Sequence, residues 1–124
     1  MTYDEIINKN KDMLPSDYKW WATHAFHFTA LDNAISILKS GVLYSRIKAN
    51  QNALMHNENA SRAVISTTDF EVLSYVRFYF RPLTPTQYYN EGFKHSQLRL
   101  DSQGSNISIP IFFVFKLNFL LSDN

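Results

Sequence analysis

The pattern of hydrophobic and polar positions is clearest over residues 75–89, which read YVRFYFRPLTPTQYY. Aromatic and β-branched residues recur with a period of two over Tyr75–Phe80, which predicts a half-buried strand. Pro82 and Pro85 then oppose continued sheet or helix, and the residues around them carry hydroxyl and amide groups. Such a stretch is either a core strand followed by a turn or the rigid edge of a ligand site.

Residues 2–13 predict a short helix. Thr2 and Glu5 have the spacing of a capping box, in which each residue satisfies a backbone N–H near the helix start. Pro15 ends this helix, and Trp20 and Trp21 follow it. The tryptophan pair either packs against the core or offers its rings for stacking on nucleic-acid bases.

A brief strand over Ala25–Phe28 is expected to lead directly into a second helix. Thr29 and Asp32 form a second capping-box pair, and Gly41 suits the left-handed position after the last turn. One face of this helix is apolar, with Leu31, Ala34, Ile35 and Leu38. Val42–Ser45 then predicts a short strand.

The rest of the chain is less regular. Residues 46–60 are polar and fit a helix with loops or a flap, residues 61–68 fit either helix or strand, and residues 69–74 fit a turn. Residues 91–105 are a polar excursion without strong periodicity. Residues 107–117 are the most apolar run and predict a fully buried strand. Few strands are available to cover it, so we expect a domain truncated at its C-terminus or completed by a partner.

Composition narrows the class of protein. The chain has 124 residues, 45% of them hydrophobic and 15% aromatic, which fits one globular domain over residues 1–124. It has no cysteine, so disulfides and thiolate chemistry are excluded. Its net charge is +1, so any contact with nucleic acid must come from a local patch of charge. The N-terminus lacks the apolar core of a signal peptide, and no apolar run is long enough to span a bilayer. We therefore expect a cytoplasmic protein without a membrane partner.

His27 and two arginines are the first candidates for chemistry. His27 lies in the tetrad FHFT, where it is either a core histidine bonded to backbone or part of a strand-to-helix junction that suits a ribose, amide or phosphate. Arg62, in the stretch NASRAVIS, is either a surface residue or a fixed cation for phosphate, and Arg46 is its rival.

Arg77 and Arg81 are four residues apart on the expected strand and therefore share a face. They are either exposed charges on a sheet edge or contacts for a nucleic-acid backbone. The other histidines have no metal-ligand spacing, and the sequence contains no HExxH, P-loop, GxGxxG or GxSxG motif. These absences disfavour metal catalysis and hydrolase triads.

Taken together, FHFT, the helix after it, GVLYS, NASR and YVRFYFRPLTPTQYY resemble the DarT family. The resemblance covers residues 26–89 and continues weakly into IPIFFVF. It implies a toxin that uses NAD to ADP-ribosylate a base in single-stranded DNA, with no metal. The implied fold is α+β, an incomplete split antiparallel sheet of the ADP-ribosyltransferase type with flanking helices.

The resemblance also implies roles for individual residues. Arg62 is the catalytic arginine, which anchors NAD and assists the attacking base. NAD contacts are assigned to His27, Phe28, Thr29, Ser36, Tyr44, Arg62, Tyr75 and Tyr79, where one of the two central-strand tyrosines stacks on nicotinamide. The DNA side is assigned to Arg77, Arg81, Thr84 and Gln87.

The sequence departs from the family at one position. The family's catalytic glutamate lies on a strand beyond FFVF, and Glu91 is in the wrong segment to replace it. We therefore expect a truncated NAD-binding half with little activity alone, and a macrodomain-type antitoxin as a further partner. Two alternatives remain, a non-catalytic single-stranded nucleic-acid-binding module and a metal-independent ribonuclease using His27 and Arg62.

Overall fold

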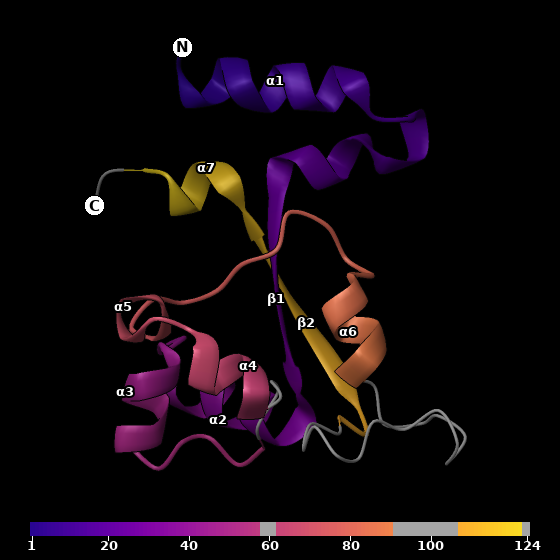
Figure 1. Ribbon diagram of the computed structural model, residues 1–124. Helices are drawn as coiled ribbons and strands as arrows, with labels where there is room; N and C mark the ends of the chain where they lie inside the picture. Colours follow the sequence, from indigo (N-terminus) through magenta and orange to yellow (C-terminus); the bar gives the residue numbers. More distant parts are fainter. Residues whose placement is uncertain (58–61, 91–106, 123–124) are drawn as a thin grey trace. The chain divides into compact units, whose positions relative to one another are not determined.

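The computed structural model describes residues 1–57, 62–90 and 107–122, with side chains from Val64 onward in the second range. The described residues form helices and two strands, as Figure 1 shows. In order, the elements are α1 (Tyr3–Met13), the 3₁₀ helix η1 (Ser16–Thr23), β1 (His24–Ala30), α2 (Leu31–Ser40), α3 (Arg46–Gln51), α4 (Arg62–Thr67), α5 (Phe70–Leu73), α6 (Pro85–Asn90), β2 (Pro110–Lys116) and α7 (Leu117–Leu120). The mixture confirms the α+β class.

The two strands form one sheet. β1 and β2 run in opposite directions and are hydrogen-bonded to each other (Figure 1). On β1, Phe26 also forms an isolated antiparallel bridge with Tyr79, with both N–H···O distances at 2.8 Å. Among the described residues, none of the helices has the length and apolar character needed to cross a membrane.

The chain divides into two compact units, and the boundary falls inside both strands. The first unit comprises Met1–His27, Phe78–Thr84 and Phe112–Asn124; the second comprises Phe28–Arg77 and Pro85–Ile111. The junction between strand β1 and helix α2, which the sequence marked as a possible site, therefore belongs largely to the second unit.

The core of the first unit joins its helices to its strands. Ile7 of α1, Ala25 of β1 and Leu117 of α7 are buried together, and Phe78 and Leu120 pack against them. The predicted capping box is confirmed at the start of α1. There the Thr2 amide donates to Glu5 Oε2 at 2.7 Å and the Glu5 amide donates to Thr2 Oγ1 at 3.3 Å.

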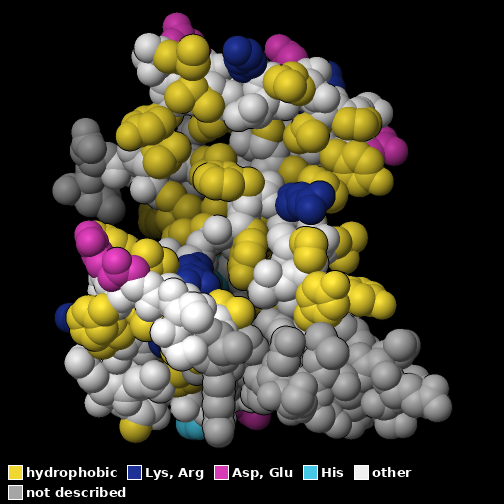
Figure 2. All heavy atoms as spheres, in the orientation of Figure 1, with side chains coloured by type: hydrophobic (Ala, Val, Ile, Leu, Met, Phe, Trp, Pro, Cys, Tyr) yellow, Lys and Arg dark blue, Asp and Glu magenta, His cyan; other side chains and the backbone are white. Residues whose placement is uncertain are grey.

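The tryptophan pair of η1 packs against other aromatic rings, in agreement with the first of the two interpretations given above. The Trp21 ring lies 4.6 Å from that of Tyr18, and the Trp20 ring contacts Phe26 edge-on at 5.6 Å. Trp20 nevertheless keeps 47% of its surface exposed, and Tyr18 keeps 46%. Figure 2 shows hydrophobic side chains gathered on the face in view where Figure 1 draws η1 and α1.

Helix α2 ends as the sequence predicted but begins differently. Gly41 has φ +68° and its amide donates to Ile37, which confirms the left-handed end. Thr29 does not cap the helix: the residue before α2 is Ala30, and no side chain caps it. The reason is that β1 continues to Ala30, and the Leu31 amide still donates to Ile109 O at 3.0 Å.

Two predicted strands are wrong. Val42–Ser45 forms no strand, because Ser45 instead caps α3 by accepting a hydrogen bond from the Lys48 amide. With the described parts of the chain, Tyr75–Phe80 makes only the single bridge through Tyr79, and Tyr75 and Phe80 are 61% and 73% exposed. An alternating pattern favours extended backbone, but a ladder also needs a neighbouring strand along its whole length.

Helices replace the turns expected on either side of that stretch. Residues 69–74 contain the single helical turn α5, which Asp69 caps by accepting from the Glu71 amide at 3.0 Å. Pro85 does not oppose a helix but begins α6. Proline is tolerated there because the first helical residue needs no N–H partner.

The apolar run near the C-terminus is a strand, but it is shorter and less buried than predicted. β2 covers Pro110–Lys116 and is mostly half-buried, whereas Ile107 before it is fully buried. Residues 62–67, which fitted helix or strand, are the helix α4, and residues 46–51 are the helix α3. The excursion at residues 91–105 lies outside the described residues.

Candidate functional site

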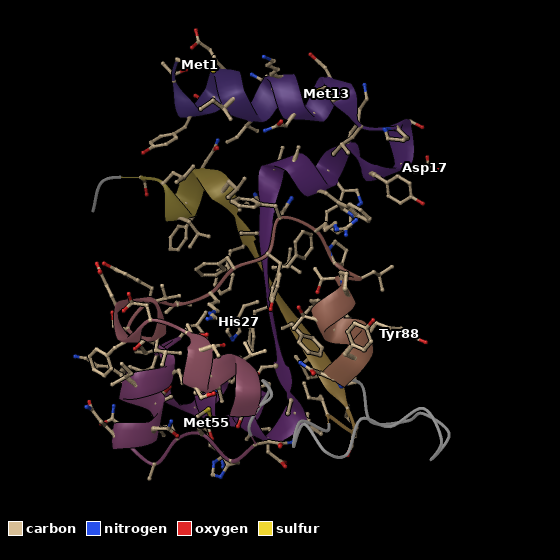
Figure 3. The ribbon with its side chains drawn as sticks, in the orientation of Figure 1. Met1, Met13, Asp17, His27, Met55 and Tyr88 are labelled. Carbon is tan, nitrogen blue, oxygen red and sulfur yellow. The ribbon has the colours of Figure 1, made fainter. Side chains whose placement is uncertain are left out.

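The end of β1 presents three candidate residues in sequence, one half-buried and two buried. Phe28 and Thr29 are 7% and 2% exposed, while His27 is half-buried. In the first unit, the ring of His27, which Figure 3 labels, meets the Phe78 ring edge-on, with centroids 6.2 Å apart. His27 is thus held on a rigid strand by an aromatic neighbour, as a binding residue needs to be.

Tyr79 is the other candidate whose position is well defined in the first unit. Its backbone is fixed by the bridge to Phe26, and its side chain is half-buried. Arg81 is exposed, and Thr84 is half-buried just before α6. Leu83 between them has φ +59°, an uncommon conformation for a branched side chain.

The second unit carries the remaining candidates on several elements. Tyr75 follows α5, and its hydroxyl donates to Glu71 Oε1 at 3.3 Å. Arg77 is exposed and Tyr44 is half-buried between α2 and α3. Gln87, assigned to the DNA side, is only 5% exposed on α6. Gln87 is therefore largely shielded from solvent, in contrast to the exposed arginines.

Arg62, the expected catalytic residue, is the first residue of α4. Its side chain lies outside the described atoms, as do residues 58–61 before it. Arg46, its rival for the same role, begins α3 and is half-buried. The structure therefore locates the two arginines at the starts of two short helices.

Helix α2 holds the segment before Arg62 through a side chain that the sequence did not single out. Asn33 Oδ1 accepts from the amides of His56 and Asn57 at 2.8 and 3.0 Å, and Asn33 Nδ2 donates to Asn57 O at 2.7 Å. The side chain of Asn33 is 6% exposed. Asparagine is a poor helix former, so its place in the first turn of α2 was the one available signal.

A second contact joins the same two segments. His56 Nε2 and Ser36 Oγ share a hydrogen bond at 2.8 Å. Ser36 was assigned as an NAD contact, and the structure shows it paired with a histidine that was considered only as a metal ligand. Among the described residues, no group of three His, Asp or Glu side chains is arranged to hold a metal.

Comparison with known proteins adds a family match. The family model described as "ssDNA thymidine ADP-ribosyltransferase, DarT" matches residues 26–124. No curated protein and no solved structure matches the chain. The match confirms the resemblance drawn from the sequence motifs. It includes every candidate residue named above, whereas α1 and η1 lie before its start.

Proposed function

Because the chain belongs to the DarT family, a family of ADP-ribosyltransferases that act on single-stranded DNA, we propose that it transfers ADP-ribose from NAD to a thymidine base. The observation that carries the proposal is the match over residues 26–124, which includes the complete set of candidate NAD and DNA residues. The proposed role is that of a toxin acting on DNA in the cytoplasm, countered by a macrodomain-type antitoxin.

The reaction breaks one bond and forms one. The bond between nicotinamide nitrogen and ribose C1 breaks, and nicotinamide leaves with the bonding electron pair. A nitrogen of the thymine base then attacks the ribose carbon, which has oxocarbenium character, and the base loses its proton. Single-stranded DNA suits this chemistry because its bases are already unpaired, which avoids most of the cost of flipping a base out of a duplex.

We assign the NAD side to the end of β1 and the residues after it. His27 offers an imidazole and Thr29 a hydroxyl from positions two residues apart, on the same face of the strand, so a dinucleotide finds both donors and acceptors there. Phe28 supplies an apolar surface. Ser36 and Tyr44 are weaker contacts, and the Ser36 hydroxyl can still accept or donate one further bond beside His56.

Arg62 is proposed as the catalytic residue. A guanidinium stays charged at neutral pH and binds pyrophosphate through parallel N–H groups, which fits the anchoring of NAD. Its place at the start of α4 puts it on an ordered element. A tyrosine is proposed to stack on nicotinamide: Tyr79 has the better fixed backbone, whereas Tyr75 has the more exposed ring.

The DNA side is proposed to use the exposed Arg77 and Arg81 for phosphate contacts, with Thr84 as a hydrogen-bonding neighbour. Gln87 is proposed to act there by keeping α6 in place, since its own side chain is buried.

The test separates NAD binding from transfer. NAD binding to the full chain is measured by calorimetry, and transfer is measured with NAD labelled in its adenylate part and two oligonucleotides, one containing thymidine and one without it. We expect NAD binding that Arg62→Ala weakens at least tenfold, and label only on the thymidine-containing strand. Arg46→Ala is the matched control. Absence of NAD binding by the wild-type chain, together with unlabelled DNA, overturns the proposal.

One observation favours a second function, that of a non-catalytic single-stranded DNA-binding module. Trp20 and Tyr18 expose nearly half of their surface in η1, outside the matched residues. Exposed aromatic rings can stack on bases without sequence preference. This alternative predicts DNA binding that NAD does not change and that Trp20→Ala weakens, without labelled product.

A further inference from the structure

The side chain of Asn33 forms a clamp between α2 and the segment Leu54–Asn57. Three hydrogen bonds of 2.7–3.0 Å join its amide group to the backbone of two consecutive residues, His56 and Asn57. The side-chain amide therefore satisfies backbone N–H and C=O groups of this segment, as the backbone of a neighbouring strand would. Figure 3 shows this stretch of chain, marked by the label at Met55, beside the helices of the second unit.

The clamp is part of a continuous connection along α2. Asn33 is four residues after Thr29, so it lies in the first turn of the helix that follows the end of β1. Ser36, one turn later on the same face, holds the imidazole of His56. Two successive turns of α2 thus form hydrogen bonds to the segment 54–57, one turn to its backbone and the next to the side chain of His56.

That segment also has other contacts, among them the hydrogen bond that the Leu54 amide donates to Ala49 O at 2.9 Å. Residues 54–57 belong to neither a helix nor a strand, and Ala53 before them has φ +52°. Arg62 begins α4 only five residues after Asn57, so their Cα atoms are at most about 18 Å apart. Fixing the backbone at His56 and Asn57 therefore restricts where the start of α4 can lie.

We propose that Asn33 is a positioning residue for NAD binding, which couples the end of β1 to the segment that leads to Arg62. The inference rests on the proposed function, since it concerns the same NAD site. Asn33 does not itself contact NAD in this proposal. It lowers the conformational freedom of the 54–57 segment, so that less ordering remains to be done when NAD binds.

Two variants distinguish the bonds of the clamp. Asn33→Ala removes all three. Asn33→Asp keeps an oxygen to accept from the amides of His56 and Asn57, but it places a second oxygen against Asn57 O where Nδ2 donated. The matched control is Thr2→Ala, which removes the cap of α1 in the first unit and so lowers stability without touching the clamp.

Amide hydrogen exchange of the free full-length chain reports on the clamp directly. In Asn33→Ala we expect the amides of His56 and Asn57 to exchange at least about tenfold faster than in the wild type, with Asn33→Asp between the two. The amide of Ile107, which donates to Asn90 O at 2.8 Å elsewhere in the second unit, serves as the internal reference. Equal exchange at His56 and Asn57 in all three proteins overturns the clamp.

Calorimetric titration with NAD then tests the positioning role. We expect Asn33→Ala to raise the NAD Kd about tenfold or more and Asn33→Asp to raise it less, whereas Thr2→Ala leaves the Kd unchanged while lowering the melting temperature. If the wild type binds NAD and Asn33→Ala binds it with an unchanged Kd, the positioning role is overturned but the proposed function is not. Failure of the wild type to bind NAD overturns the proposed function instead, and the positioning role with it.

Discussion

Gly41 shows how one residue can determine where a helix ends. Its φ of +68° is reached without strain only by glycine and, less well, by asparagine, and a Cβ added there would meet nothing within 4 Å. The cost of Gly41→Ala is therefore one of backbone conformation alone. We expect a loss of about 1 kcal/mol in the free energy of unfolding.

Urea denaturation of the full chain measures this loss. Gly41→Asn is the matched variant and should lose less, because asparagine tolerates the left-handed conformation. Equal stability of the alanine variant and the wild type would show that residue 41 does not adopt this conformation in solution.

Gly41 and Thr2 were predictable because their signals are local. Each acts on backbone groups within four residues, so spacing alone identifies the structure. Asn33 was not predictable in this way, because its partners lie 23 and 24 residues away. The role of Thr29 was mistaken for a related reason: pairing of β1 with the distant residue Ile109 moved the helix start beyond it.

At the scale of elements, α1 depends on its cap more than on its burial. Ile7 is its one buried residue, and most of its other side chains face solvent. Thr2→Ala removes the hydroxyl that accepts from the Glu5 amide, and we expect it to lower the free energy of unfolding by about 1 kcal/mol. Chemical denaturation is the measurement, and Thr2→Ser, which keeps the hydroxyl, should remain close to the wild type. A full loss in the serine variant as well would contradict the capping role.

The stretch from Tyr75 to Phe80 shows the limit of pattern at this scale. Its alternating aromatics predicted a strand, but whether such a stretch becomes a strand depends on its neighbours. In the described structure only Tyr79 finds one, at Phe26. The same argument explains why Pro110–Lys116 is a strand, since it pairs with β1.

Hydrogen exchange can verify this single bridge. The amide of Tyr79 donates to Phe26 O at 2.8 Å, whereas none of the hydrogen bonds among the described residues uses the amide of Phe80. We expect the Tyr79 amide to exchange about tenfold or more slowly than that of Phe80. Tyr79→Pro, which lacks the donor, should also release the Phe26 amide. Protection of the Arg77 and Arg81 amides as well, in register with Tyr79, would instead indicate the full strand.

For the whole molecule, a net charge of +1 means that attraction to DNA cannot come from the chain as a whole. If binding depends on a few exposed arginines, the logarithm of the binding constant should fall with the logarithm of salt concentration by about 0.7 per phosphate contact. Arg77→Gln and Arg81→Gln, both at exposed positions, should each reduce this slope by about 0.7.

Fluorescence anisotropy with a labelled single-stranded oligonucleotide measures the slope at several salt concentrations, and Lys39→Gln, exposed at the end of α2, is the matched loss of one charge. The wild-type and Lys39→Gln slopes should agree, because loss of a charge that contacts no phosphate leaves the number of phosphate contacts unchanged. A general charge effect would instead reduce the slope of Lys39→Gln as much as that of the two arginine variants. A slope that Arg77→Gln and Arg81→Gln leave unchanged, with Trp20→Ala weakening binding at all salt concentrations, would place DNA on the aromatic surface of η1. The family assignment would then account for NAD chemistry in residues 26–124 but not for the DNA contact.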